Sequence, residues 1–88
     1  MDARQTIGWN LRRLRVAKGL SQERLALAAE IDRSYVGRVE RGAENVTVST
    51  IEALAEVLDV HVSALFQHVD DAAAKPAPLR SGRKPKTG

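Results

Sequence analysis

The fold is decided by residues 21–42, which read SQERLALAAEIDRSYVGRVERG. Ser21 and Asp32 are residue types that favour the N-cap of a helix, and each precedes a short run with helical periodicity. These runs predict two short helices joined by a turn of about three residues. Val36 and Val39 give the second helix an apolar face that would pack it onto the first. The segment therefore predicts a rigid corner of two helices.

The opposite face of the second helix is expected to be exposed and available to bind a ligand. A helix held in such a corner can enter the major groove of DNA, which is about 12 Å wide. Arginine suits this role because its guanidinium can donate two hydrogen bonds to O6 and N7 of guanine. The residues expected on this outer face are Arg33, Ser34, Tyr35, Gly37 and Arg38.

The rest of the chain also shows helical patterns. A first helix is expected over about residues 3–18, because Gly19 follows as a C-cap. Thr47 or Ser49 would cap a fourth helix, and Ser49 with Glu52 has the spacing of a capping box. The inward face of this fourth helix is expected to consist of Val48, Ile51, Leu54, Ala55 and Leu58.

A fifth short helix is expected after a tight connection at residues 59–61. It carries apolar residues that exceed what a terminal helix on so small a core needs. These are Val62, Leu65, Phe66 and Val69. The alternating pattern of a β-strand occurs nowhere in the sequence. We therefore expect an all-α fold of five helices.

Length and composition limit the class of protein. The 88 residues suffice for one small domain, which is marginally stable alone and gains from oligomerisation. The absence of cysteine excludes a disulfide framework and thiolate metal sites. The sequence has no apolar run of membrane-spanning length, and residues 1–5 lack the apolar core of a signal peptide. We expect a cytoplasmic protein that does not engage a membrane.

Charge is distributed unevenly along the chain. Residues 1–41 hold nine Lys or Arg and five Asp or Glu, whereas residues 42–71 hold six acids and no Lys or Arg. Residues 72–88 hold five Lys or Arg and no acid, with three prolines and two glycines. Such a segment cannot supply a core, so it predicts a disordered basic tail after a domain at 1–71. A polyanion would be attracted to the first half and to the tail.

Catalytic and metal chemistry find little support in the sequence. His61 and His68 lie near acidic residues, but no paired His or Cys ligand spacing accompanies them. Trp9 and Phe66 are expected to be packing residues, because a single-strand binder needs several exposed aromatic side chains. So short a helical domain leaves little room for a substrate cleft. We expect no enzyme, no metal and no cofactor.

Several motifs in the same order resemble one known family. They are IGxxLRxLR at 7–15, GLSQExLA at 19–26, VERG at 39–42 and IxxLAxxLxV at 51–60. The chain resembles the lambda-repressor and Cro type of helix-turn-helix regulator, also called the XRE family, over about residues 4–67. Residues 32–36, 40–42 and 45–48 look most like the controller proteins of restriction–modification systems.

The resemblance implies a role for each matching position. Gln22 would bind a DNA phosphate and orient side chains of the recognition helix. Asn45 matches a loop position that approaches phosphate, and Tyr35 a position near the backbone or a thymine methyl. Arg15 and Glu40 match a partly buried ion pair. The positions that match base-reading residues are Arg33, Ser34, Gly37 and Arg38. The fifth helix commonly makes the dimer contact in this family.

The sequence departs from the family pattern at the turns and in one loop. Glu30 and Asp59 stand where glycine is frequent, and a left-handed backbone at Glu30 would cost about 1 kcal/mol. His61 replaces the usual serine cap of the fifth helix. The loop at 43–44 contains Glu44, although many relatives have a basic loop there. We expect this loop to weaken phosphate affinity on its side.

Two functions remain open from the sequence. The first is a repressor or activator that binds double-stranded DNA as a homodimer through the fifth helix, reading a two-fold symmetric site. The second is an antitoxin or co-regulator module that mainly binds a partner protein. Arg33 and Arg38 favour the first function, because a helix that binds a protein partner would more often be apolar there.

Overall fold

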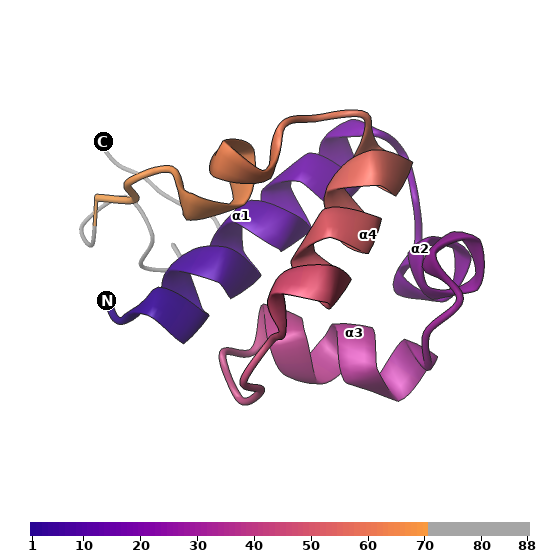
Figure 1. Ribbon diagram of the computed structural model, residues 1–88, viewed down its shortest axis with the longest axis horizontal. Helices are drawn as coiled ribbons and strands as arrows, with labels where there is room; N and C mark the ends of the chain where they lie inside the picture. Colours follow the sequence, from indigo (N-terminus) through magenta and orange to yellow (C-terminus); the bar gives the residue numbers. More distant parts are fainter. Residues whose placement is uncertain (71–88) are drawn as a thin grey trace, which may run out of the picture.

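A computed structural model describes residues 1–70 of the chain. Within this range it contains four α-helices and a 3-10 helix, and no strand (Figure 1). They are α1 (Ala3–Ala17), α2 (Gln22–Ala29), α3 (Arg33–Glu40), α4 (Val48–Leu58) and η1 (Val62–Phe66). The all-α prediction is confirmed, but the fifth element is a 3-10 helix and not an α-helix. The predicted basic tail at 72–88 lies outside the described residues.

The elements close into a ring around the core. The main contacts join α1 to α3, α3 to α2, α2 to α4, α4 to η1, and η1 back to α1. In Figure 1, α3 lies along the lower edge beside α2, while η1 lies at the opposite edge. Leucines fill the centre, and five of them are fully buried: Leu11, Leu25, Leu54, Leu58 and Leu65. Every element except α3 contributes to this set, and α3 adds the buried Val36 and Val39.

Side chains cap most of the helix starts. Asp2 accepts from the backbone N–H of Gln5, whose own side chain accepts from the N–H of Asp2. Ser21 Oγ accepts from the N–H of Arg24 at 3.0 Å. Asp32 occupies the N-cap of α3 as predicted, but its side chain makes no capping hydrogen bond. Two of these three N-cap side chains therefore accept from an otherwise unpaired N–H group at the start of their helix.

The start of α4 corrects the predicted capping box. Thr47 is the N-cap, and its Oγ1 accepts from the N–H of Thr50 at 3.1 Å. Ser49 therefore lies inside the first turn, and its proposed pairing with Glu52 was wrong. Val48 is also not inward, because it is 72% exposed at the first helical position. Of the two predicted caps, Thr47 is therefore confirmed, and Ser49 would have placed the start of the helix two residues too late.

The segment around η1 is fixed to α1 by a buried asparagine. Asn10 is 1% exposed, and its Nδ2 donates to the carbonyls of Leu65 at 3.1 Å and Gln67 at 2.8 Å. His61 is the N-cap of η1, where its Nδ1 accepts from the N–H of Ser63. A buried amide that satisfies two carbonyls holds this otherwise short segment against the core.

The predicted dimer surface on this segment needs correction. Leu65 is completely buried and Val69 is 9% exposed, so both belong to the core of the monomer. Phe66 is 50% exposed and Val62 is partly buried. A single 3-10 turn rotates successive side chains differently from an α-helix, and it directs Leu65 inward. Only Phe66 and Val62 remain available from the predicted set.

A glycine brings α1 and α3 close together. A Cβ atom at Gly8 would lie 2.4 Å from the carbonyl oxygen of Val39 and 2.8 Å from that of Glu40. Only glycine permits this approach of two backbones. The contact fixes the C-terminal end of α3 directly on α1. The position of the second helix of the corner is therefore set by backbone contact as well as by side chains.

The two turns with non-glycine residues are strained as expected. Glu30 ends α2 with φ 60° and ψ 43°, and Asp59 ends α4 with φ 57° and ψ 47°. Both lie in the left-handed region that disfavours residues with a Cβ atom.

Among residues 1–70, no helix is long and apolar enough to cross a membrane.

Candidate nucleic-acid interface

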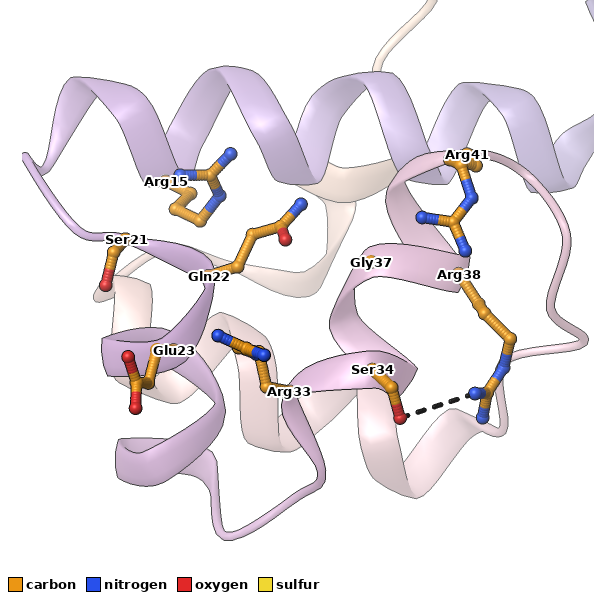
Figure 2. A pocket seen from close by; sticks show the side chains of 9 residues that line it. All are labelled: Arg15, Ser21, Gln22, Glu23, Arg33, Ser34, Gly37, Arg38 and Arg41. Atoms are coloured by element: carbon orange, nitrogen blue, oxygen red, sulfur yellow. Dashed lines mark hydrogen bonds between the residues drawn. The ribbon is translucent and has the colours of Figure 1, made fainter.

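A depression of about 630 Å³ opens between the start of α2 and the exposed side of α3 (Figure 2). Its walls are mostly polar, and four of the nine lining residues are arginines. The lining residues are Arg15, Ser21, Gln22, Glu23, Arg33, Ser34, Gly37, Arg38 and Arg41. Arg33, Arg38 and Arg41 against Glu23 give this face a positive potential that attracts a polyanion, whereas Glu40 compensates the charge of Arg15.

Arg15, which lines the depression, forms a partly buried ion pair with Glu40. Arg15 Nε donates to Glu40 Oε2 at 2.6 Å and Arg15 Nη2 donates to Glu40 Oε1 at 3.1 Å. The side chains are only 12% and 4% exposed. Arg15 Nη1 also donates to the carbonyl of Leu20 at 2.8 Å. The expected pair between α1 and α3 is present, and its bidentate geometry joins the two helices in one orientation.

Gln22 extends this network to α2. Its Nε2 donates to Glu40 Oε1 at 3.0 Å, so one carboxylate connects α1, α2 and α3. An amide nitrogen carries two N–H groups, and among residues 1–70 only Glu40 accepts from this one. In Figure 2 the Gln22 side chain extends from the start of α2 between Arg15 and Arg33. The second N–H is therefore available to an acceptor on a ligand.

Gly37 lies on the outer side of α3 and lines the depression, but it is not exposed there as the sequence suggested. It is buried, and a Cβ atom there would lie 3.2 Å from Arg41 Nη1 and 3.7 Å from Gln22 Oε1. Long side chains from the next turn and from α2 cover it. The lack of a side chain at this position allows Arg41 and Gln22 to approach each other.

The start of α3 presents the exposed groups. Arg33 and Ser34 are exposed, whereas Tyr35 is only partly exposed and packs against the core. Figure 2 shows Arg33 directed into the space between α2 and α3. Tyr35 thus offers only part of its side chain to a ligand. The expected outer face is reduced to Arg33, Ser34 and Arg38, with Tyr35 at its margin.

Arg38 is held by neighbours on three sides. Its Nε donates to Glu44 Oε1 at 2.8 Å, and its Nη1 lies 3.5 Å from Ser34 Oγ. The guanidinium carbon lies 5.6 Å from the centroid of the Tyr35 ring, within cation–π range. The hydrogen bond to Glu44 raises the pKa of Arg38, and the attraction of that carboxylate acts in the same direction. Arg38 is permanently charged and has a defined orientation.

The loop after α3 is attached to the start of α1. Asn45 Oδ1 accepts from Arg4 Nη1 at 3.3 Å, and both residues are exposed. This contact leaves the amide nitrogen of Asn45 as a possible donor. The candidate phosphate contact at Asn45 therefore lies beside a further arginine that the sequence reasoning did not select.

Sequence reasoning missed Arg41 and the role of Glu44. Positions 34, 37, 38 and 41 follow the i, i+3, i+4, i+7 spacing of one helix face, so helical periodicity was a signal for Arg41. Glu44 was recognised as an acid in a usually basic loop, but its partner lies six residues earlier across a turn. Only the folded loop brings the two side chains together.

Comparison with known proteins agrees with this geometry. Residues 11–65 match the family described as helix-turn-helix. A hypothetical transcription factor of Neisseria meningitidis is 46% identical over 59 residues, which cover 67% of this chain and 56% of that protein. The chain thus spans little more than half of that relative's length.

Solved structures of helix-turn-helix regulators also resemble this chain. The restriction-modification controller protein C.AhdI from Aeromonas hydrophila is 52% identical, with a TM-score of 0.70 over 72% of this chain and 96% of that one. The controller protein C.Esp1396I, solved as a tetramer in complex with its natural 35 base-pair operator, is 27% identical with a TM-score of 0.68 over 75% of this chain and 87% of that one. The chain belongs to the helix-turn-helix family of XRE type, whose members are transcriptional regulators.

Proposed function

We propose that this protein is a transcriptional regulator that binds double-stranded DNA in a sequence-specific manner. It acts as a homodimer on a two-fold symmetric operator, in the cytoplasm, without a cofactor and without catalysis. The helix α3 enters the major groove, and Arg33 and Arg38 read base edges. The controller protein C.Esp1396I, solved on its operator, supports this proposal through its similarity to this chain.

The observation that carries the proposal is the arginine-lined depression in front of an immobilised helix. Arg33, Ser34 and Arg38 project from α3, while Gly8 and Glu40 fix the same helix to α1 from behind. Base readout needs donors at defined positions, and a rigid support provides them. The cationic face gives no apolar surface of the kind that a protein partner would bind. Within the described residues, this face therefore favours DNA binding over the alternative of an antitoxin or co-regulator module.

A selection from a random duplex library, followed by fluorescence anisotropy, tests the base-reading role. Arg33→Ala is expected to cost about 1–3 kcal/mol on the selected duplex and to relax the preference at particular base pairs. Arg12→Ala is the matched control, because Arg12 is an exposed arginine of α1 that does not line the depression. It should change binding to selected and shuffled duplexes equally. Equal losses on both duplexes for Arg33→Ala would contradict the proposal.

Gln22 contributes differently from the arginines. Its amide nitrogen is held by Glu40 and has a second N–H at the start of α2, where backbone N–H groups also attract phosphate. Gln22→Ala should weaken binding to the selected and shuffled duplexes by a similar factor and leave the selected consensus unchanged. A changed consensus in a repeated selection would reject the phosphate role.

Dimerisation is proposed to use the side of the molecule opposite α3. A symmetric dimer places two recognition helices about 34 Å apart on one face of DNA. Phe66 and Val62 provide the apolar surface that remains on η1. Phe66→Glu should shift the protein toward monomer in sedimentation equilibrium, whereas Leu27→Glu on α2, at a position that is 73% exposed, should not. A strictly monomeric wild-type protein would refute this part of the proposal.

A further inference from the structure

Glu44 is an acid at the edge of a surface that is otherwise suited to an anion. Its Oε1 accepts from Arg38 Nε at 2.8 Å, and its side chain is only 26% exposed. A carboxylate without a protein partner would extend into solvent, whereas the Glu44 carboxylate turns back onto α3. Its closest charged partner is a residue that the proposed function assigns to base readout.

The contact uses the one guanidinium nitrogen that base readout does not need. A guanidinium has five N–H groups, one on Nε and two on each Nη atom. Glu44 accepts from the Nε–H, Ser34 Oγ lies 3.5 Å from Nη1, and the guanidinium carbon lies over the Tyr35 ring, 5.6 Å from its centroid. Within residues 1–70, Nη2 has no protein acceptor. A bidentate contact with guanine can use Nη groups that point away from the carboxylate.

The arrangement also restricts the motion of a flexible side chain. An arginine on a helix surface has many rotamers, and binding normally requires that one of them be selected. Arg38 is 43% exposed, yet its Nε position, its ring contact and its serine neighbour define a single orientation. A side chain already fixed in its bound orientation loses less freedom when it binds.

We propose that Glu44 is a positioning residue for base readout: it holds the Arg38 guanidinium so that the Nη groups face the DNA. This inference rests on the proposed DNA-binding function. Glu44 then has two separable effects. Its charge lowers affinity for every DNA through repulsion of phosphates, and its hydrogen bond increases the discrimination of one base pair through Arg38.

Two substitutions separate the charge of Glu44 from its hydrogen bond. Glu44→Gln removes the charge but keeps a carbonyl oxygen that can accept from Nε–H, whereas Glu44→Ala removes both. Glu56→Ala is the matched control, because Glu56 is an exposed acid on α4 with no contact to α3 side chains among the described residues. The readout is the ratio of affinities for the selected duplex and for duplexes with single base-pair changes. Arg38→Ala first identifies the base pair that Arg38 reads.

The two variants should differ at one base pair only. Both should bind shuffled duplexes more tightly than wild type, since both lose one negative charge. Glu44→Ala should lose about tenfold in discrimination at the base pair identified with Arg38→Ala, and keep it elsewhere. Glu44→Gln should keep most of that discrimination. Glu56→Ala should leave the affinity ratio unchanged.

Other results overturn the proposal in distinguishable ways. If Glu44→Ala and Glu44→Gln behave alike at every base pair, Glu44 acts by charge alone and the positioning role is refuted. If Arg38→Ala alters no base preference while Arg33→Ala does, the inference fails and Arg38 loses its proposed base-reading role, but sequence-specific DNA binding through α3 and Arg33 stands. If wild-type protein selects no preferred duplex at all, the proposed function fails and the inference fails with it.

Discussion

The inner and outer sides of α3 each carry an ion pair, and the two pairs differ mainly in burial. On the inner side, Arg15 and Glu40 are 12% and 4% exposed, with a shortest distance of 2.6 Å. On the outer side, Arg38 and Glu44 are 43% and 26% exposed, with a distance of 2.8 Å. The two ion pairs have similar N–O distances but different burial, so we expect them to differ in their effect on folding stability.

Burial decides what each pair contributes. A charge shielded from water requires an oppositely charged partner, because an uncompensated buried charge lowers the free energy of unfolding. Exposed charges are hydrated and screened, so their pairing changes folding stability little. The inner pair therefore stabilises the position of α3, whereas the outer pair contributes little to folding and can take part in ligand binding. The same residue types perform a structural role on one side of a helix and a binding role on the other.

The largest effect on folding should come from Glu40. Glu40→Gln removes the charge that compensates buried Arg15 and weakens the bonds from Arg15 and Gln22. We expect a loss of about 3 kcal/mol in the free energy of unfolding, measured by urea denaturation. Glu52→Gln, at an exposed position of α4, is the control and should change little. An unchanged unfolding free energy for Glu40→Gln would show that the inner pair is not structural.

Gly8 tests whether the inner side also depends on backbone contact. The Cβ of Gly8→Ala would meet two carbonyl oxygens of α3 at 2.4 and 2.8 Å, so the helices must separate. We expect a loss of about 2 kcal/mol despite the better helix propensity of alanine. Gly37→Ala is the matched control, because its Cβ would meet only the mobile end of Arg41 at 3.2 Å. Equal stability of the two variants in thermal melts would argue against a close contact of α1 with α3.

The turn between α2 and α3 should show a smaller effect of opposite sign. Glu30 has φ 60°, and Glu30→Gly should increase the free energy of unfolding by about 1 kcal/mol because glycine adopts this conformation without strain. Asp59→Gly, with φ 57°, should behave in the same way. Glu56→Gly lies inside α4 and should instead destabilise the fold. Destabilisation by all three glycines would show that the turns are not strained.

The smallest effect on folding should come from the outer pair. Glu44→Ala breaks the contact with Arg38, yet we expect the melting midpoint to stay within a few degrees of wild type. Circular dichroism melts at low and high salt would measure this. A loss of stability as large as that of Glu40→Gln would remove the distinction between the two sides of α3.

Much of the fold followed from local signals. The first helix was predicted over about residues 3–18 and runs over Ala3–Ala17, and α2 and α3 begin directly after the predicted N-caps Ser21 and Asp32, because caps and glycine stops act within one turn. The ion pair of Arg15 and Glu40 was expected from family resemblance, and the strain at Glu30 from the residue type. These features depend on short stretches of chain or on motifs in a fixed order.

The errors arose where a residue's surroundings come from distant parts of the chain. Gly37 was predicted on the outer face and lies there, but it is not exposed, because Gln22 of α2 and Arg41 of the next turn cover it. Leu65 and Val69 were assigned to a dimer surface, but α1 and α4 bury the segment that carries them. Asn10 was not considered, and it is the buried amide that attaches this segment to α1.

The sequence by itself determined that this chain forms a helical corner with arginines on its exposed side, because helical periodicity and N-capping are local and are written in neighbouring residues. Only the tertiary structure decided how those arginines are used. The packing of α1 against α3 brings Glu40 to Arg15, and Glu40 neutralises Arg15 on the inner side of α3. The course of the loop after α3 brings Glu44 to Arg38, and Glu44 orients Arg38 on the outer side of this helix. Charge alone does not distinguish the two arginines, and burial with a fixed partner does.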